Sequence, residues 1–116
     1  MITYGLGETD PNGVDQHDLG AKLDSGKPDA SLLGMFGRAL LAVAEVGTHG
    51  AAKYTRGGWQ HVSDGFNRYT AAMLRHYLKE NQEEYDTDLP VLHAAQVAWN
   101  ALARLELLLR EKEEDV

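Results

Sequence analysis

The stretch VLHAAQVAWNALARLELLLREKEE, residues 91–114, decides the fold class. Apolar side chains occupy nearly every position from Val97 to Leu109, which is typical of a helix that is buried on most sides. A charged tail at residues 110–115 follows and should be solvated. We therefore expect a long, central and buried helix against which the rest of the chain packs.

Two upstream segments also carry apolar residues at helical spacing. SLLGMFGRALLAVAEV predicts a helix over residues 31–46, which the GTHG at 47–50 should stop. SDGFNRYTAAMLRHYLKENQ predicts a second helix over about residues 64–81, with Ser63 or Asp64 as its N-cap. Because we find no strong alternating strand pattern, we predict an all-α fold, a small helical bundle with a loop-rich N-terminal segment.

The first 30 residues are rich in Gly, Asp and Pro, a composition that forms turns and loops. We predict a flexible N-terminal segment, residues 1–19, and a single all-α domain, residues 20–116. The last helix has more apolar surface than two or three neighbouring helices of one short chain can cover. We therefore expect a homo-oligomer, a dimer or a tetramer, to complete the bundle.

Composition excludes several classes of protein. The chain of 116 residues has no cysteine, so disulfides, zinc–thiolate sites and thiol nucleophiles are absent. We find no apolar stretch approaching the roughly 18–20 residues that cross a bilayer, and no secretory signal pattern. We expect a cytoplasmic protein without a membrane partner. The net charge of -7 argues against stable nucleic-acid binding.

A polar line runs along the apolar last helix. His93, Gln96 and Asn100 stand at i, i+3 and i+7, and Arg104 extends the line on the same face. Buried polar side chains cost roughly 1–3 kcal/mol each when unpaired, so the line needs partners. A ligand, an internal hydrogen-bond network and a half-exposed face all remain open.

The second helix and the loop after it offer candidate ligands. Arg75 and His76 lie at the middle of the helix, and the following loop, EEYDTDLP, contributes carboxylates. These are Glu83, Glu84, Asp86 and Asp88. Imidazole with carboxylate suits Mn, Co or Zn, whereas carboxylates alone suit Mg. A solvated acidic turn is the plainer interpretation.

The stretch KYTRGGWQHV, residues 53–62, combines cations with flat rings. Lys53 and Arg56 can contact phosphate, and Tyr54 and Trp59 offer faces on which a base can stack. The competing interpretation is that Trp59 plugs the edge of the core and Tyr54 ends a helix. Lys27, in LDSGKPD, could likewise hold an anion or simply be a solvated turn lysine.

In this order, several motifs resemble the phage family of dATP/dGTP diphosphohydrolases of the N-terminal type. The motifs are KLDSGKPDASLL, GTHGAAKYTRGGW, AAMLRHYL and EEYDTDLPVLHAAQVAWNAL, and together they span about residues 20 to 109. Members of the family often have a second histidine where this chain has Gln96. A more distant resemblance is to the MazG-like all-α pyrophosphohydrolases, which use Mg.

The resemblance implies hydrolysis of purine deoxynucleoside triphosphates to the monophosphate and pyrophosphate, in phage nucleotide metabolism. The host cytoplasm is then the expected location, and a divalent ion the cofactor, with Mg first and Mn or Co as alternatives. As metal ligands we expect His76, Asp86 and His93; as catalytic carboxylates, Glu83, Glu84 and Asp86; as substrate-binding residues, Lys27, Lys53, Tyr54, Trp59, Arg75 and Asn100. A non-catalytic nucleotide-binding protein, or a structural or regulatory oligomeric phage protein, remains the alternative.

Overall fold

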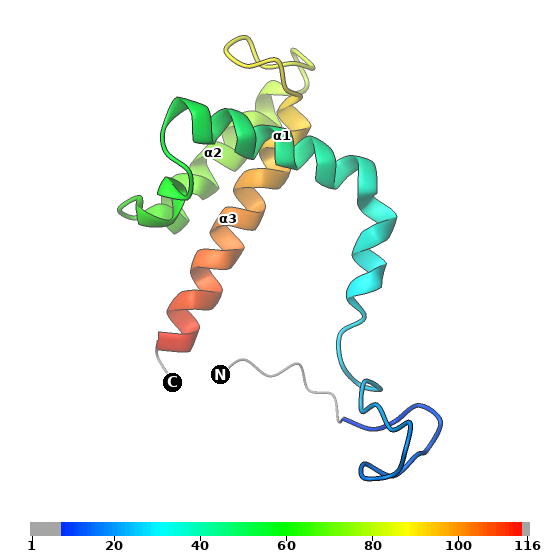
Figure 1. The fold of residues 1–116 in the computed structure, drawn as a ribbon. Helices are drawn as coiled ribbons and strands as arrows, with labels where there is room; N and C mark the ends of the chain where they lie inside the picture. The colour runs from blue at the N-terminus through cyan, green and yellow to red at the C-terminus, as the bar shows by residue number, and fades with distance from the viewer. Residues whose placement is uncertain (1–7, 115–116) are drawn as a thin grey trace. The chain divides into compact units, whose positions relative to one another are not determined.

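The computed structural model describes residues 8–114, in which helices and turns dominate (Figure 1). The elements are the 3-10 helix η1 (Ala30–Phe36), α1 (Gly37–Lys53), the 3-10 helix η2 (Gly58–His61), α2 (Gly65–Lys79) and α3 (His93–Glu114). The described residues contain no strand, only two isolated β-bridges. The predicted all-α fold is therefore confirmed. The chain divides into two compact units, one ending at Met35 and one beginning at Phe36.

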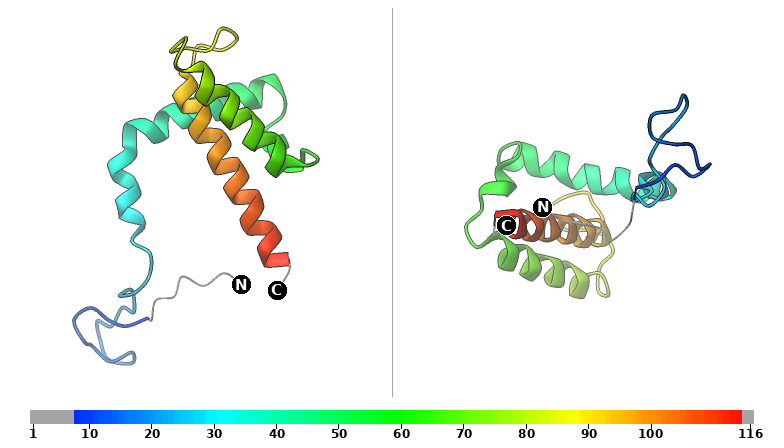
Figure 2. Two further views of the ribbon diagram at one scale, coloured as in Figure 1. Left: turned by 180° about the vertical axis from the view of Figure 1, so that it is seen from behind. Right: turned by 90° about the horizontal axis from the view of Figure 1, so that it is seen from below.

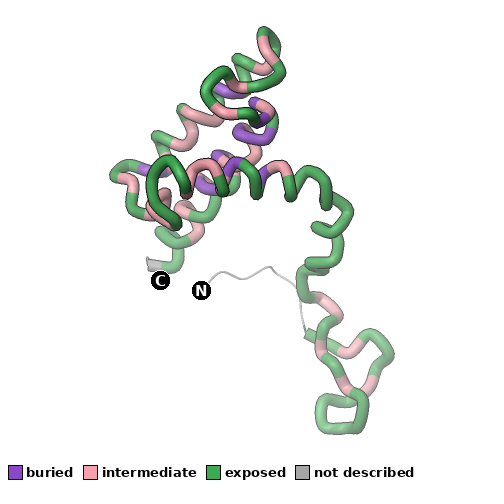
Figure 3. Tube along the Cα trace, turned by 45° about the horizontal axis from the view of Figure 1, so that its top comes forward, coloured by how far each residue is buried: buried purple, intermediate pink, exposed green. Residues whose placement is uncertain are grey.

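In the helical unit, which begins at Phe36, α3 lies between α1 and α2 (Figure 2, right). Its core is small: Val46 on α1 packs with Val91, Ala95 and Trp99, and Val43 and Ala103 are also buried. Among the described residues, every buried position belongs to the helical unit (Figure 3). The central position predicted for the last helix is thus correct.

Burial of that helix on most sides is wrong for the single chain. Leu102 and Leu105 on α3 are 50% and 48% exposed, and Leu74 and Leu78 on α2 are also exposed. The physical reason is that α1 and α2 cover only part of the circumference of α3. The outer face stays apolar, as the sequence indicates, but no described residue of the helical unit covers it.

The end of the first long helix also differs from the sequence prediction. The segment begins as η1, where the Ser31 amide donates to Asp29 Oδ1 at 3.0 Å, and α1 then continues through GTHG to Lys53. Gly47 lies directly under the ring of Trp99, where a Cβ atom would sit only 2.7 Å from Cζ3. Close packing against α3 therefore uses the glycine that we expected to stop the helix.

The continuous helical stretch Ala30–Lys53 has the length and apolar composition of a membrane-crossing helix. Our sequence-based statement that no stretch approaches this length is therefore wrong. The criterion is weak evidence, because core helices of soluble proteins also meet it. The C-terminal part of the stretch places Val43 and Val46 in buried positions of the helical unit.

The N-terminal unit is organised by turns. Thr9 and Ser25 form an antiparallel bridge. The carboxylate of Asp10 accepts hydrogen bonds from the amides of Lys22, Asn12 and Val14, which lower the pKa of Asp10. The predicted flexible segment at 1–19 falls partly on residues 1–7, outside the described residues, and it stays a prediction.

Candidate active site

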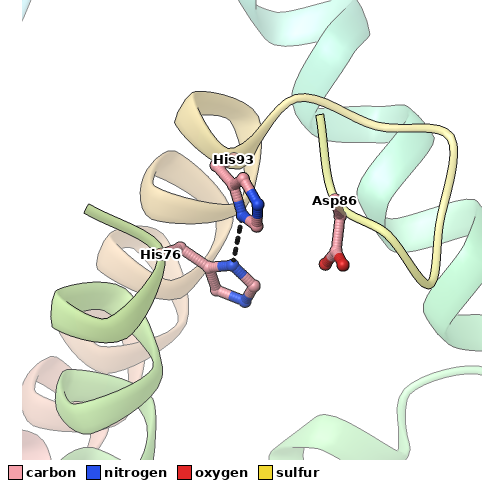
Figure 4. A group of neighbouring side chains, drawn as sticks. All are labelled: His76, Asp86 and His93. Atoms are coloured by element: carbon pink, nitrogen blue, oxygen red, sulfur yellow. Dashed lines mark hydrogen bonds between the residues drawn. The ribbon is translucent and has the colours of Figure 1, made fainter. Parts of the chain in front are cut away.

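Two histidines from different helices meet at the end of the helical unit. His76 on α2 and His93, the first residue of α3, place their Nδ1 atoms 2.9 Å apart (Figure 4). His93 is fully buried, and its Nε2 lies 3.0 Å from Glu83 Oε1. The result is a continuous series of contacts from a carboxylate through one imidazole to a second imidazole.

The acidic loop folds back so that Asp86 faces this pair. The Asp86 amide donates to the Val91 carbonyl at 2.9 Å, and the His93 amide donates to the Glu84 carbonyl at 3.0 Å. The carboxylate of Asp86 accepts from the Asp88 amide at 3.0 Å and from Gln96 Nε2 at 2.5 Å. The loop therefore holds one oxygen of the Asp86 carboxylate, and α3 holds the other.

His76, Asp86 and His93 each offer one ligand atom, and these three atoms lie within 4.8 Å of one another. Two imidazoles and a carboxylate are a donor set that suits a divalent transition metal. The set could hold such an ion after a modest contraction. The structure thus brings together the three side chains that we expected to ligate metal.

Burial lowers the pKa of His76; the nearby Asp86 opposes this shift, while His93, Arg75 and Lys79 reinforce it. For Asp86, burial alone would raise the pKa, but the hydrogen bonds from Asp88 and Gln96, with the two histidines, bring it below its ordinary value. A neutral imidazole thus faces an ionised carboxylate at neutral pH. These are the protonation states that bind metal.

A cleft of about 1290 Å³ opens beside His76 and Asp86. Cationic side chains line it, namely Lys53, Arg56, Arg68, Arg75 and Lys79. Aromatic residues also line it, namely Tyr54, Trp59, Tyr69 and Trp99. A cleft that combines several cations, rings and a carboxylate–imidazole group suits an anion that carries a flat ring.

The predicted substrate-binding residues divide into two groups. Lys53, Tyr54, Trp59, Arg75 and Asn100 all line the cleft. Lys27 belongs to the N-terminal unit, where its Nζ lies 4.0 Å from Glu8, and its role toward a substrate stays a prediction. Glu83 and Glu84, the expected catalytic carboxylates, are not among the residues that line the cleft.

The two aromatic residues of the 53–62 stretch differ in how much of each ring is packed against other side chains. Tyr54 is the C-cap of α1 and is 73% exposed at the cleft. The ring of Trp59 lies edge-on to Tyr69 and Trp99, with centroids 6.4 and 6.3 Å away. Trp59 thus has the packing role that we considered as its alternative, and Tyr54 is the freer surface for a base.

The polar line on α3 is partly an internal network. Asn100 Nδ2 donates to the Gln96 carbonyl at 2.8 Å. Arg104 Nε donates to Thr70 Oγ1 at 2.7 Å, and the guanidinium lies 4.5 Å from the centre of the Phe66 ring. Gln96 and Asn100 nevertheless also line the cleft. Of the three interpretations that the sequence left open, the internal network therefore applies to part of the line, and Gln96 and Asn100 remain placed to meet a ligand.

Sequence reasoning missed three contributors to the site. Arg68 and Lys79 share the cleft-lining face of α2 with Arg75, and their offsets of seven and four along the helix were a signal. The contact between Gln96 and Asp86 had no such signal, because it depends on how the loop folds back onto α3.

A model of the dATP/dGTP diphosphohydrolase, N-terminal family matches residues 17–116. The searches of curated proteins and of solved structures gave no match. The family match includes α1, α2 and α3 and every residue of the site described above. The chain therefore belongs to the dATP/dGTP diphosphohydrolase, N-terminal family.

Proposed function

We propose that this chain is a metal-dependent hydrolase that converts dATP or dGTP to the monophosphate and pyrophosphate. The observation that carries the proposal is the meeting of His76, Asp86 and His93 at the edge of a cation-lined cleft. The family to which the chain belongs supports the same reaction.

The positions of the cationic side chains along α2 indicate how the substrate is oriented in the cleft. Arg68 and Lys79 are separated by eleven positions, which is about 16 Å along a helix, and Arg75 lies between them. His76 adjoins Arg75, so the triphosphate belongs at the end with Arg75 and Lys79. The base then lies toward Tyr54. Each unit charge pair at 4 Å contributes about 4 kcal/mol at an effective dielectric near 20, enough for a few contacts to hold a polyanion on an acidic chain.

In the reaction, the oxygen of water forms a bond to the α-phosphorus, and the bond from this phosphorus to the bridging oxygen breaks. Pyrophosphate leaves with its charge offset by Arg75 and Lys79. A divalent ion, when bound, lowers the pKa of water and neutralises the phosphates. Asp88 lines the cleft beside Asp86, and we assign it, ahead of Glu83 or Glu84, to accept the proton of the attacking water.

The test is to incubate the protein with each deoxynucleoside triphosphate and with Mg, Mn or Co, and to separate the products. The proposal expects monophosphate and pyrophosphate from a purine substrate. Mg is our first choice of metal, and two imidazole ligands make Mn or Co the next. Absence of turnover with every nucleotide and every metal would reject the proposal that the protein is an enzyme.

One observation favours a second candidate, a non-catalytic nucleotide-binding protein. The direct contact between His76 and His93 satisfies two ligand nitrogens without a metal. Calorimetry that detects dATP binding in the absence of metal, together with no turnover in its presence, would select this candidate.

We also propose that the chain acts as a homo-oligomer, a dimer or a tetramer, in the cytoplasm and without a membrane or nucleic-acid partner. The exposed apolar side chains of α3 and α2, including Leu102, Leu105 and Leu74, support a shared interface. Light scattering at micromolar concentration tests the assembly. A monomer mass for the wild-type chain would contradict it.

A further inference from the structure

A buried series of polar contacts stands behind His76. Glu83 Oε1 lies 3.0 Å from His93 Nε2, and His93 Nδ1 lies 2.9 Å from His76 Nδ1. His93 has no exposed surface and does not line the cleft, whereas His76 does. Figure 4 shows the second ring nitrogen of His76 pointing away from His93. The two histidines therefore differ in their access to a ligand.

The contacts determine where the ring protons lie. A carboxylate only accepts hydrogen bonds, so His93 must donate from Nε2 to Glu83. In a neutral imidazole the other nitrogen is then an acceptor, which makes His93 Nδ1 the acceptor of its contact with His76. His76 must therefore donate from Nδ1, and its Nε2 keeps a free lone pair.

We infer that Glu83 and His93 are positioning residues that fix the tautomer of His76, so that His76 Nε2 faces the cleft as the nitrogen available for a metal ion. This assigns His76 and Asp86 to the cleft side of the site, and places His93 behind them in the metal-free protein. The inference deepens the proposed function and rests on it for its consequence. The tautomers themselves require neither metal nor nucleotide.

The direct test is the tautomeric state of both histidines in the metal-free, full-length protein. Long-range proton–nitrogen correlation spectra at about pH 8, where an ordinary histidine is neutral, distinguish protonated from unprotonated ring nitrogens. We expect His76 to be protonated at Nδ1 only and His93 at Nε2 only. A proton on His76 Nε2, or an unprotonated His93 Nε2, would overturn the assignment.

Two variants distinguish the role of Glu83 as a hydrogen-bond acceptor from the role of its negative charge. Glu83→Leu removes the acceptor, so His76 should no longer hold a single tautomer, whereas Glu83→Gln keeps an oxygen that can accept from His93 and should preserve it. Gln82→Leu is the matched control, since it introduces the same side chain at the exposed neighbouring position. A fixed His76 tautomer in Glu83→Leu would refute the positioning role.

The same variants have a metal-binding readout. Loss of an outer partner of a ligating histidine costs roughly 10–100-fold in metal affinity. Titration with Mn²⁺ alone should show this loss in Glu83→Leu, with recovery in Glu83→Gln and no change in Gln82→Leu. Equal affinities in all three would contradict the inference. Absence of nucleotide turnover would reject the proposed function and leave the tautomer result standing, so the two failures are distinguishable.

Discussion

Replacement of Gly47 by alanine tests how α1 is held against α3. A Cβ atom at this position would lie 2.7 Å from Trp99 Cζ3 and 3.0 Å from Cη2, well inside the roughly 3.5–4.0 Å at which carbon atoms attract. The ring also packs edge-on against Trp59, with the two centroids 6.3 Å apart, so a shift of Trp99 away from Gly47 would disturb this contact. Overpacking of this kind costs about 1–3 kcal/mol.

The helix itself partly offsets this cost, since alanine is about 1 kcal/mol better than glycine in a helix interior. Gly50→Ala is therefore the matched control. Gly50 is in the same helix, and a Cβ there would meet nothing within 4 Å. The difference between the two variants cancels helix propensity and leaves the contact with Trp99, about 1–3 kcal/mol in free energy of unfolding.

Thermal unfolding followed by circular dichroism, at equal protein concentration, measures this difference. In a domain of this size about 1 kcal/mol corresponds to roughly 4 °C, so Gly47→Ala should melt about 4–12 °C below Gly50→Ala. If Gly47→Ala melts at or above Gly50→Ala, then Gly47 does not pack under Trp99, and the arrangement of α1 on α3 that forms the cleft is wrong.

Further predictions concern the site and the interface. Asp86→Asn should reduce turnover by more than about 100-fold with an unchanged circular dichroism spectrum, because an essential metal ligand should cost more than an outer partner does; near-wild-type turnover would remove Asp86 from the site. Gln96→Leu should weaken Mn²⁺ binding about 10–100-fold, since Asp86 loses the donor that holds it; unchanged affinity in calorimetry would contradict this. The pKa of His76 is lowered in the folded protein, so as pH falls the unfolded state takes up a proton on this histidine at a higher pH than the folded state does. The free energy of unfolding of the metal-free protein should therefore fall as pH drops below about 6.5. Urea midpoints that stay constant from about pH 7 to 5 would refute this prediction. Leu105→Glu should convert the oligomer to a monomer in light scattering, and an unchanged mass would place the interface elsewhere.

The sequence predicts the helices better than it predicts what surrounds them. Periodicity places α2 and α3 within about two residues of their observed bounds. It fails at the end of α1, because the cost of a glycine in a helix is small and local, whereas the packing of Gly47 under Trp99 depends on a residue fifty-two positions later. It also overestimates the burial of α3, since periodicity shows that a face is apolar but not what covers it.

For the candidate site, residue types indicated the two histidines and the acidic loop, and the resemblance to the family selected Asp86 with His76 and His93, which the structure brings together. Their relative roles were not predictable. Which histidine faces the cleft depends on the angle at which α2 meets α3, and the partner of Gln96 depends on the path of the acidic loop. Both are three-dimensional properties of contacts between segments that are distant in sequence.

The most direct test of the account is a crystal structure of the full chain with Mn²⁺ and a non-hydrolysable dATP analogue. The account predicts an anomalous signal for manganese beside Asp86 and His76, with the phosphates of the analogue along Arg75 and Lys79 and its base near Tyr54. Manganese bound away from these side chains, or a nucleotide outside the cleft, would contradict it.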